Sequence, residues 1–150
     1  MEITHTVMRG ALAWAAVFSF ASAQAQMTPV GNWHSMDEKT SELKSLIQVS
    51  ENNGVLSGRI DKLLRKDADQ KAVCKECSDE RKDKPILGLE IIRGARKAAD
   101  KDVWEGGKIL DPENGKEYSL RMTPIEGGNK LEVRGSIAFF GRTQTWHRVK

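Results

Sequence analysis

The sequence predicts an all-β protein, a small closed antiparallel up-and-down β-barrel of about eight strands. Apolar residues alternate along the chain more often than they recur at helical spacing. Turn sequences at residues 53–54, 111–115 and 127–129 each separate two alternating segments, which indicates consecutive hairpins. A β-meander of this size can avoid unpaired edge strands if its first and last strands pair with each other, so a closed barrel is the expected architecture.

The expected strands follow these turns in chain order. Asn53-Gly54 supplies the positive φ angles of a type I′ turn. The segments 111–115 and 127–129 also contain Asn and Gly residues, which favour turns of the same kind. Residues 93–102 are expected to form a short helix or a long turn on the outside. The strands themselves are expected at residues 31–36, 44–51, 55–64, 86–92, 103–110, 117–123, 130–138 and 142–149.

The amino terminus predicts a secretory signal peptide over residues 1–25. Residues 11–21, ALAWAAVFSFA, form an apolar run followed by small residues, so cleavage is expected after Ala23 or Ala25. The run is about half the roughly 20 residues that a bilayer-spanning helix needs, and we expect no stable membrane insertion. These features predict a periplasmic or secreted protein.

The remaining chain, residues 30–150, is expected to form one domain with a single core. The formal charge of +3 comes from 24 Lys and Arg against 21 Asp and Glu, and the two signs are interleaved. Interleaved charge and predicted export together argue against a nucleic acid partner. The leading charges Glu2 and Arg9 offset each other, which makes Met8 an alternative start to Met1.

Alternation assigns one set of side chains to the lumen of the barrel. In a small barrel such residues either line a pocket for a small, partly hydrophobic ligand or fill the interior completely, and both readings stay open. Arg142, Gln144 and Trp146 share one face of the last strand, where they either line a polar mouth or cover the outside. The candidate lumen residues are Ile47, Val49, Leu56, Ile60, Tyr118, Leu120, Met122, Leu131 and Val133.

Residues 65–85 interrupt the hairpin pattern with seven Lys or Arg, six Asp or Glu and few apolar side chains, which predicts a long solvated loop. The loop holds Cys74 and Cys77 at C-x-x-C spacing. An oxidising compartment favours a disulfide, while redox activity and metal binding remain alternatives. A zinc site would need two more ligands, for which His34 and His147 are candidates, and no cofactor is expected.

An even-stranded barrel brings its first and last strands together as antiparallel neighbours. Trp33 can then plug one end while Arg148 stacks on the indole and donates hydrogen bonds to nearby carbonyls. Gly31-Asn32-Trp33 with Arg148 resembles the G-x-W and arginine pair of lipocalins and their calycin relatives.

A longer resemblance is carried by GNW, the C-x-x-C pair, GGKILDPENGKEYSL and LEVRGSIAFFGRTQTWHRV in that order. Together they resemble a bacterial secreted family named domain of unknown function 2147, from about Val30 to Val149. The resemblance implies an exported lipocalin-like barrel. It implies no established activity and places no catalytic role on any residue.

The sequence contains no nucleophile elbow, phosphate loop or H-E-x-x-H motif, so we predict a binding protein and not an enzyme. The favoured function is ligand binding between the Trp33 plug and an open end guarded by the cysteine loop. A filled barrel that presents its charged loop and Phe139-Phe140 to an envelope component or a protein is the second hypothesis. Redox or metal chemistry at the cysteines is the third.

Overall fold

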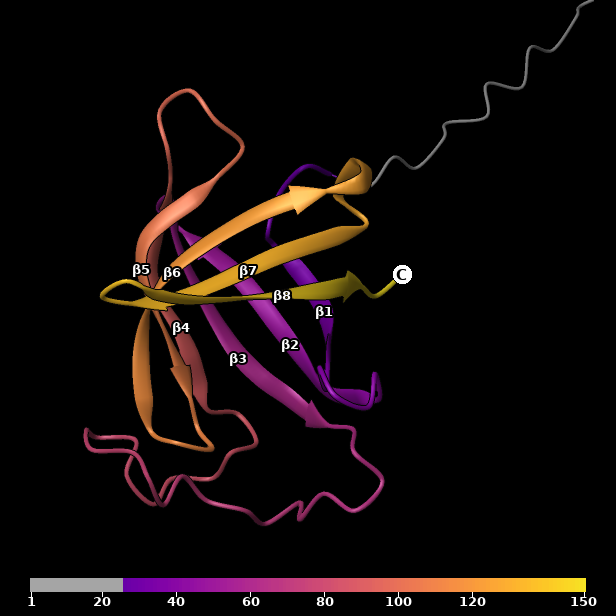
Figure 1. Ribbon diagram of the computed structural model, residues 1–150, viewed down its shortest axis with the longest axis vertical. Helices are drawn as coiled ribbons and strands as arrows, with labels where there is room; N and C mark the ends of the chain where they lie inside the picture. The colour runs from indigo at the N-terminus through magenta and orange to yellow at the C-terminus, as the bar shows by residue number, and fades with distance from the viewer. Residues whose placement is uncertain (1–25) are drawn as a thin grey trace, which may run out of the picture.

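The computed structural model describes residues 26–150, and the predicted signal peptide lies outside the described residues. Eight antiparallel strands form one closed barrel in which each strand pairs with the next in sequence and β8 pairs with β1 (Figure 1). This confirms the predicted fold class. The strands are β1 (Gly31–Met36), β2 (Leu43–Asn52), β3 (Val55–Leu63), β4 (Glu90–Lys97), β5 (Trp104–Asp111), β6 (Lys116–Ile125), β7 (Lys130–Ile137) and β8 (Phe140–Arg148).

The predicted hairpin turns are present. Asn53 and Gly54 both have positive φ angles, 51° and 77°, as a type I′ turn between β2 and β3 requires. Gly115 closes the β5–β6 turn with a φ of 70°. The 3₁₀ turn η1 (Glu126–Gly128) connects β6 to β7 at the third predicted position.

The fourth strand corrects the sequence analysis. It was expected at residues 86–92, with a helix or turn over 93–102, but β4 begins at Glu90 and continues to Lys97, and only the residues after Lys97 form a loop. The continuation has charged outer positions, and its inner position is the small, fully buried Ala95. Gly94, with a φ of 80°, adds an irregularity. A small inner residue beside charged neighbours does not produce an alternation of apolar and polar residues. For this reason the second half of β4 was not predicted as a strand.

Gly106-Gly107 lies where β4 and β5 approach each other closely. From the sequence, a bulge or a close strand crossing is favoured here over a phosphate-binding turn. Gly106 has a φ of 79°, and the register of β5 against β6 shifts between Glu105 and Gly107. A Cβ atom at Gly107 would lie 2.5 Å from the carbonyl oxygen of Arg93 on β4. The backbones of β4 and β5 therefore meet at a point where only glycine fits.

One end of the barrel is closed by Trp33, whose side chain is 0% exposed. Its indole N–H donates a hydrogen bond to the Pro29 carbonyl at 2.7 Å, and the Arg148 guanidinium carbon lies 4.1 Å from the ring centroid. Arg148 also donates to the carbonyl of Val30 at 2.9 Å and to that of Thr28 at 2.6 Å. The plug thus joins the segment before β1 to the last strand.

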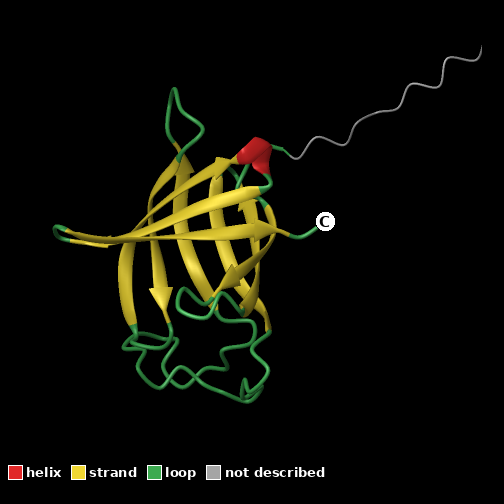
Figure 2. Ribbon diagram, turned by 45° about the vertical axis from the view of Figure 1, so that its right-hand side comes forward, coloured by secondary structure: helices red, strands yellow, loops and turns green. Residues whose placement is uncertain are grey.

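The other end of the barrel carries the loops between β1 and β2, β3 and β4, and β5 and β6, and the hairpin of β7 and β8 extends away from it (Figure 2). The predicted lumen residues all belong to the buried core except Tyr118, which is partly exposed. No helix within residues 26–150 is long and apolar enough to cross a membrane.

Candidate ligand-binding site

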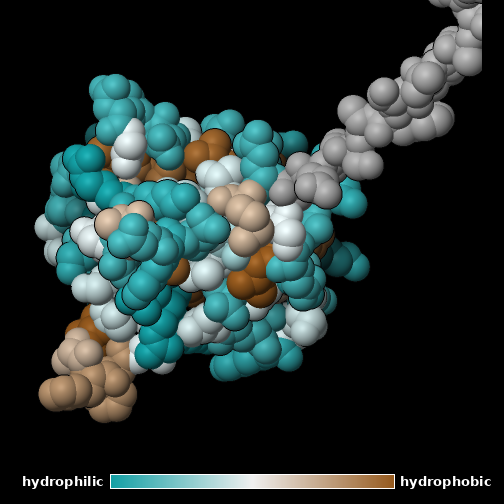
Figure 3. Space-filling view, turned by 90° about the horizontal axis from the view of Figure 1, so that it is seen from above, coloured by the Kyte–Doolittle hydropathy of each residue, from teal (hydrophilic) through white to brown (hydrophobic). Residues whose placement is uncertain are grey.

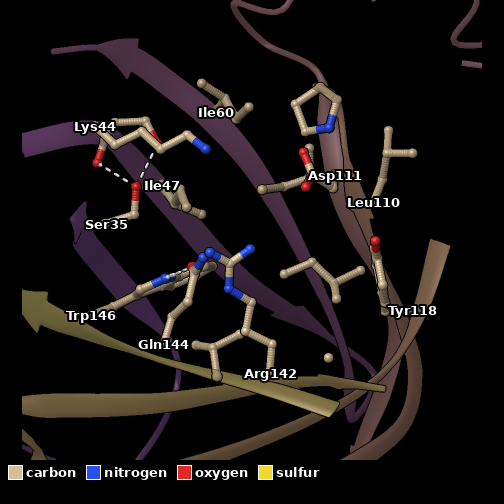
Figure 4. Close-up of a pocket in the computed structure, with 16 residues that line it drawn as sticks. Ser35, Lys44, Ile47, Ile60, Leu110, Asp111, Tyr118, Arg142, Gln144 and Trp146 are labelled. Atoms are coloured by element: carbon tan, nitrogen blue, oxygen red, sulfur yellow. Dashed lines mark hydrogen bonds between the residues drawn. The ribbon is translucent and has the colours of Figure 1, made fainter. Parts of the chain in front are cut away.

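A cavity of about 160 Å³ lies in the barrel on the side away from the Trp33 plug (Figure 4). Its wall is mainly aliphatic and aromatic, with polar side chains gathered around one part. The lining residues are Ser35, Lys44, Ser45, Ile47, Ile60, Ile91, Ile109, Leu110, Asp111, Pro112, Tyr118, Val133, Gly135, Arg142, Gln144 and Trp146. A pocket with a mostly apolar wall and a few polar groups is typical of small-molecule sites.

The predicted lumen residues divide into two groups. Ile47, Ile60, Tyr118 and Val133 line the cavity. The others do not line it and instead pack in the core, namely Val49, Leu56, Leu120, Met122 and Leu131. The predicted alternatives, a ligand pocket and a filled interior, therefore apply to different parts of one barrel. Side chains fill the region near the Trp33 plug and leave a cavity farther from it.

Arg142, Gln144 and Trp146 line the cavity, which is the polar-mouth alternative for that face of β8. Other lining residues were not predicted, among them Ser35, Ser45 and Ile109. Ser35 and Ser45 were not singled out because small hydroxyl residues on strands give no apolar signal. The strand alternation that places Ile47 inside also places Ser45 inside, and this periodicity is the signal that could have found it.

The polar groups of the wall are already partly satisfied. The Ser35 and Ser45 hydroxyls are 2.7 Å apart in a buried hydrogen bond. The indole N–H of Trp146 donates to Oε1 of Gln144 at 3.1 Å, which fixes the amide orientation. Hydroxyl and amide groups held in this way can donate to or accept from a ligand that enters the cavity.

Ion pairs surround the mouth. A second, polar hollow of about 340 Å³ shares Lys44, Asp111, Arg142 and Gln144 with the cavity wall. Arg142 donates to Glu38 at 2.6 Å, and Lys44 lies 3.0 Å from Glu113. These pairs connect β8 to the β1–β2 loop, and β2 to the β5–β6 turn, so the entrance is framed by charges of both signs.

The loop between β3 and β4 contains the disulfide Cys74–Cys77. Both cysteines are buried, and neither lines the cavity. The Cys74 sulfur packs 3.7 Å from the carbonyl oxygen of Pro112, so the loop rests on the β5–β6 turn. Most of residues 65–85 are exposed, as the sequence predicts, while Cys74, Cys77 and Arg81 are buried. Buried sulfurs are poorly placed for exchange with another thiol, which counts against the redox alternative.

Arg81 anchors the same loop to the barrel wall. Its side chain is buried, and it donates to the carboxylates of Asp79 and Glu117 and to the backbone carbonyl of Glu90 at 3.0 Å. Hydrogen bonds from the Arg81 side chain and backbone N–H lower the pKa of Asp79 to about 2. Charged residues dominate this loop in the sequence, and nothing there distinguishes Arg81 from its neighbours.

The anchor predicts a dependence of stability on pH. A carboxylate whose folded pKa is lowered stabilises the fold above its ordinary pKa and loses that effect as the pH falls through the folded value. We expect the melting temperature of the wild type to exceed that of Asp79→Asn at pH 5, and the difference to shrink as the pH falls toward 2. Thermal unfolding followed by circular dichroism measures this. A difference independent of pH would contradict it.

Two histidines are the candidate additional ligands for a metal site at the cysteines. His34 and His147 are directly paired across β1 and β8, on the outer surface opposite Trp33 and Arg148. The disulfide uses both cysteine sulfurs. No group of three or more His, Cys, Asp or Glu side chains in the described part of the chain is arranged to hold a metal ion.

The closed eight-stranded barrel, with a tryptophan and arginine plug at one end, is a lipocalin-like fold. It is similar to the solved structure of protein HP1028 from the human pathogen Helicobacter pylori, described as belonging to the lipocalin family, with a TM-score of 0.69 and 19% identity over 84% of each chain. No curated protein matches the chain. The chain belongs to the family described as uncharacterized proteins conserved in bacteria, DUF2147, whose model matches residues 31–148.

Proposed function

We propose that this is an exported barrel protein, periplasmic or secreted, that binds a small, partly apolar molecule. The observation that carries the proposal is the cavity of about 160 Å³ with an aliphatic floor and a polar mouth. An apolar cavity of about 150 Å³ is large enough to hold benzene. A ligand with one ring or a short chain therefore fits the cavity volume.

The arrangement of the wall suggests the orientation of the ligand. Ile47, Ile60 and Ile109 would contact its apolar part. Its polar group would lie near Gln144 and the Ser35–Ser45 pair, where partners for a hydrogen bond are already oriented. In this proposal the barrel binds and does not react, because the polar groups around the mouth form hydrogen bonds and ion pairs typical of recognition.

The first test is the mass of the protein purified from the exported fraction, under native and then denaturing conditions. We expect an added mass that disappears on denaturation. Binding is then measured by calorimetry with indole, a probe that combines an apolar ring with one N–H donor. No added mass together with no indole binding would overturn the proposal.

Filling the cavity is expected to weaken binding strongly. Ile109→Trp adds a large side chain to the wall, and we expect indole affinity to fall at least about tenfold, or roughly 1.4 kcal/mol. Lys108→Trp is the matched control, because Lys108 is exposed on the outer face of the same strand. If the affinity for indole falls equally in both variants, or falls in neither, the result would contradict binding in this cavity.

A further inference from the structure

The hairpin of β7 and β8 ends in an apolar tip, defined here as Ile137, Phe139 and Phe140. Phe139 is fully exposed, Phe140 is 83% exposed and Ile137 is 44% exposed. Figure 3 shows this tip as an apolar projection that stands out from a mainly hydrophilic surface. Ala138, with a φ of 51°, makes the turn without a glycine. The two phenylalanines are thus held at the outermost part of a hydrogen-bonded hairpin.

The tip continues the face of the hairpin that lines the cavity. The cross-strand pairs along β7 and β8 on this face are Leu131 with Trp146, Val133 with Gln144, Gly135 with Arg142, and Ile137 with Phe140. Paired residues two positions apart share one face of a hairpin. The same face therefore runs from the core, past the cavity wall, to the exposed tip.

A cation lies directly behind the tip. The guanidinium of Arg134 lies over Gly141 so closely that a Cβ atom there would collide with it, and it donates to the Thr143 hydroxyl at 3.3 Å. Within residues 26–150, Arg134 forms no ion pair, in contrast to Arg59, Arg93, Arg121 and Arg142. Its charge is therefore available to an anionic group beside the phenylalanines.

We propose that the tip inserts into the interface of a lipid bilayer that contains anionic lipids. Aromatic side chains prefer the boundary between head groups and acyl chains, and a neighbouring arginine complements anionic head groups. A protein partner is a poorer match, because a stable protein interface buries about 800 Å² on each side, more than a projecting turn offers. The contact would be peripheral and reversible.

This inference goes beyond the proposed function and does not depend on a ligand. If both hold, the tip places the cavity-lining face of the β7–β8 hairpin next to the lipid surface. A partly apolar molecule could then pass between bilayer and cavity along the shared face of β7 and β8 without crossing water. The inference itself requires only that the protein bind lipid through the tip.

The first experiment is flotation of the purified protein with phosphatidylcholine vesicles, with and without phosphatidylglycerol. We expect wild type to float with the vesicles that contain phosphatidylglycerol. The double variant Phe139→Ser with Phe140→Ser should lose at least about tenfold in binding, and Arg134→Gln should lose the preference for anionic lipid. Met27→Ser, which removes an exposed apolar side chain near the plug, is the matched control and should float as wild type does.

Insertion is tested by fluorescence. Trp33, Trp104 and Trp146 are all buried, so a tryptophan placed at the tip reports on its own surroundings. We expect the emission of Phe139→Trp to shift to shorter wavelength with anionic vesicles, and that of Met27→Trp to stay unchanged. Thermal unfolding of each variant checks that the barrel is intact.

Three outcomes would overturn the proposal. The first is that wild type floats with neither kind of vesicle, and the second is that the double variant floats as well as wild type. The third is that the protein self-associates through Phe139 and Phe140, measured by light scattering, without binding vesicles. This third outcome would make the tip a docking surface between copies of the chain. None of these results depends on whether indole binds in the cavity.

Discussion

Replacing Trp33 with alanine is expected to lower the free energy of unfolding by about 3–5 kcal/mol. The Trp33 side chain is fully buried, its indole N–H donates a hydrogen bond to the Pro29 carbonyl, and the Arg148 guanidinium stacks on its ring. Removing it leaves a cavity at the closed end and removes the surface against which Arg148 stacks. Both losses act on the contact between the first and last strands. Denaturation in urea, followed by circular dichroism, gives the value.

Trp33→Phe is the informative companion to Trp33→Ala. It keeps an aromatic ring for Arg148 but removes the indole N–H that bonds to Pro29, so its cost should be clearly smaller. If Trp33→Ala lowers the free energy of unfolding by less than about 1 kcal/mol, the plug contributes little to stability. Replacing a fully buried tryptophan with alanine normally costs several times that amount.

Gly107→Ala is expected to cost about 3 kcal/mol, a large effect for a single methyl group. The new Cβ would lie 2.5 Å from the Arg93 carbonyl oxygen and 2.8 Å from the Cα atom of Ala95. These are backbone atoms of β4, so no side chain can rotate to make room. The two strands must separate, which weakens their ladder and disturbs the packing of Ala95.

Gly106→Ala is the matched control one residue earlier. Gly106 has a φ of 79° but no atom within 4 Å of the position that a Cβ would take. Its cost should therefore be only the strain of a left-handed alanine, about 1 kcal/mol. Chemical denaturation of both variants measures the difference. Equal losses would mean that the close approach of β4 and β5 adds nothing to the cost of Gly107→Ala, which would contradict the prediction.

The sequence predicts best where a single residue type determines local geometry. Asn53-Gly54 places the β2–β3 turn, and the hairpins on either side of residues 111–115 and 127–129 follow from the same chemistry. The pattern failed where inner positions are small or polar. Ala95 in β4 and the Ser35–Ser45 pair at the cavity produce no alternation of apolar and polar residues.

The cavity could be predicted only in part, because its existence depends on how side chains from different strands share the interior. Alternation places Ile60 and Leu56 on the same inner face, yet Ile60 lines the cavity and Leu56 packs in the core. The anchoring of the long loop by Arg81 was beyond prediction for a related reason. Its partner Glu117 lies on β6, 36 residues away in the sequence, and comes near Arg81 only when β4, β5 and β6 have paired.

The plug also constrains when the molecule can finish folding. Arg148 bonds to the Val30 carbonyl across 118 residues, and β1 pairs with β8 at Trp33 and His34. Contacts between residues so far apart in sequence require a long stretch of chain to be ordered first, which slows folding. A chain that is exported amino terminus first, as proposed, would complete closure only after its final strand had arrived. Until then β1 would expose an unpaired edge.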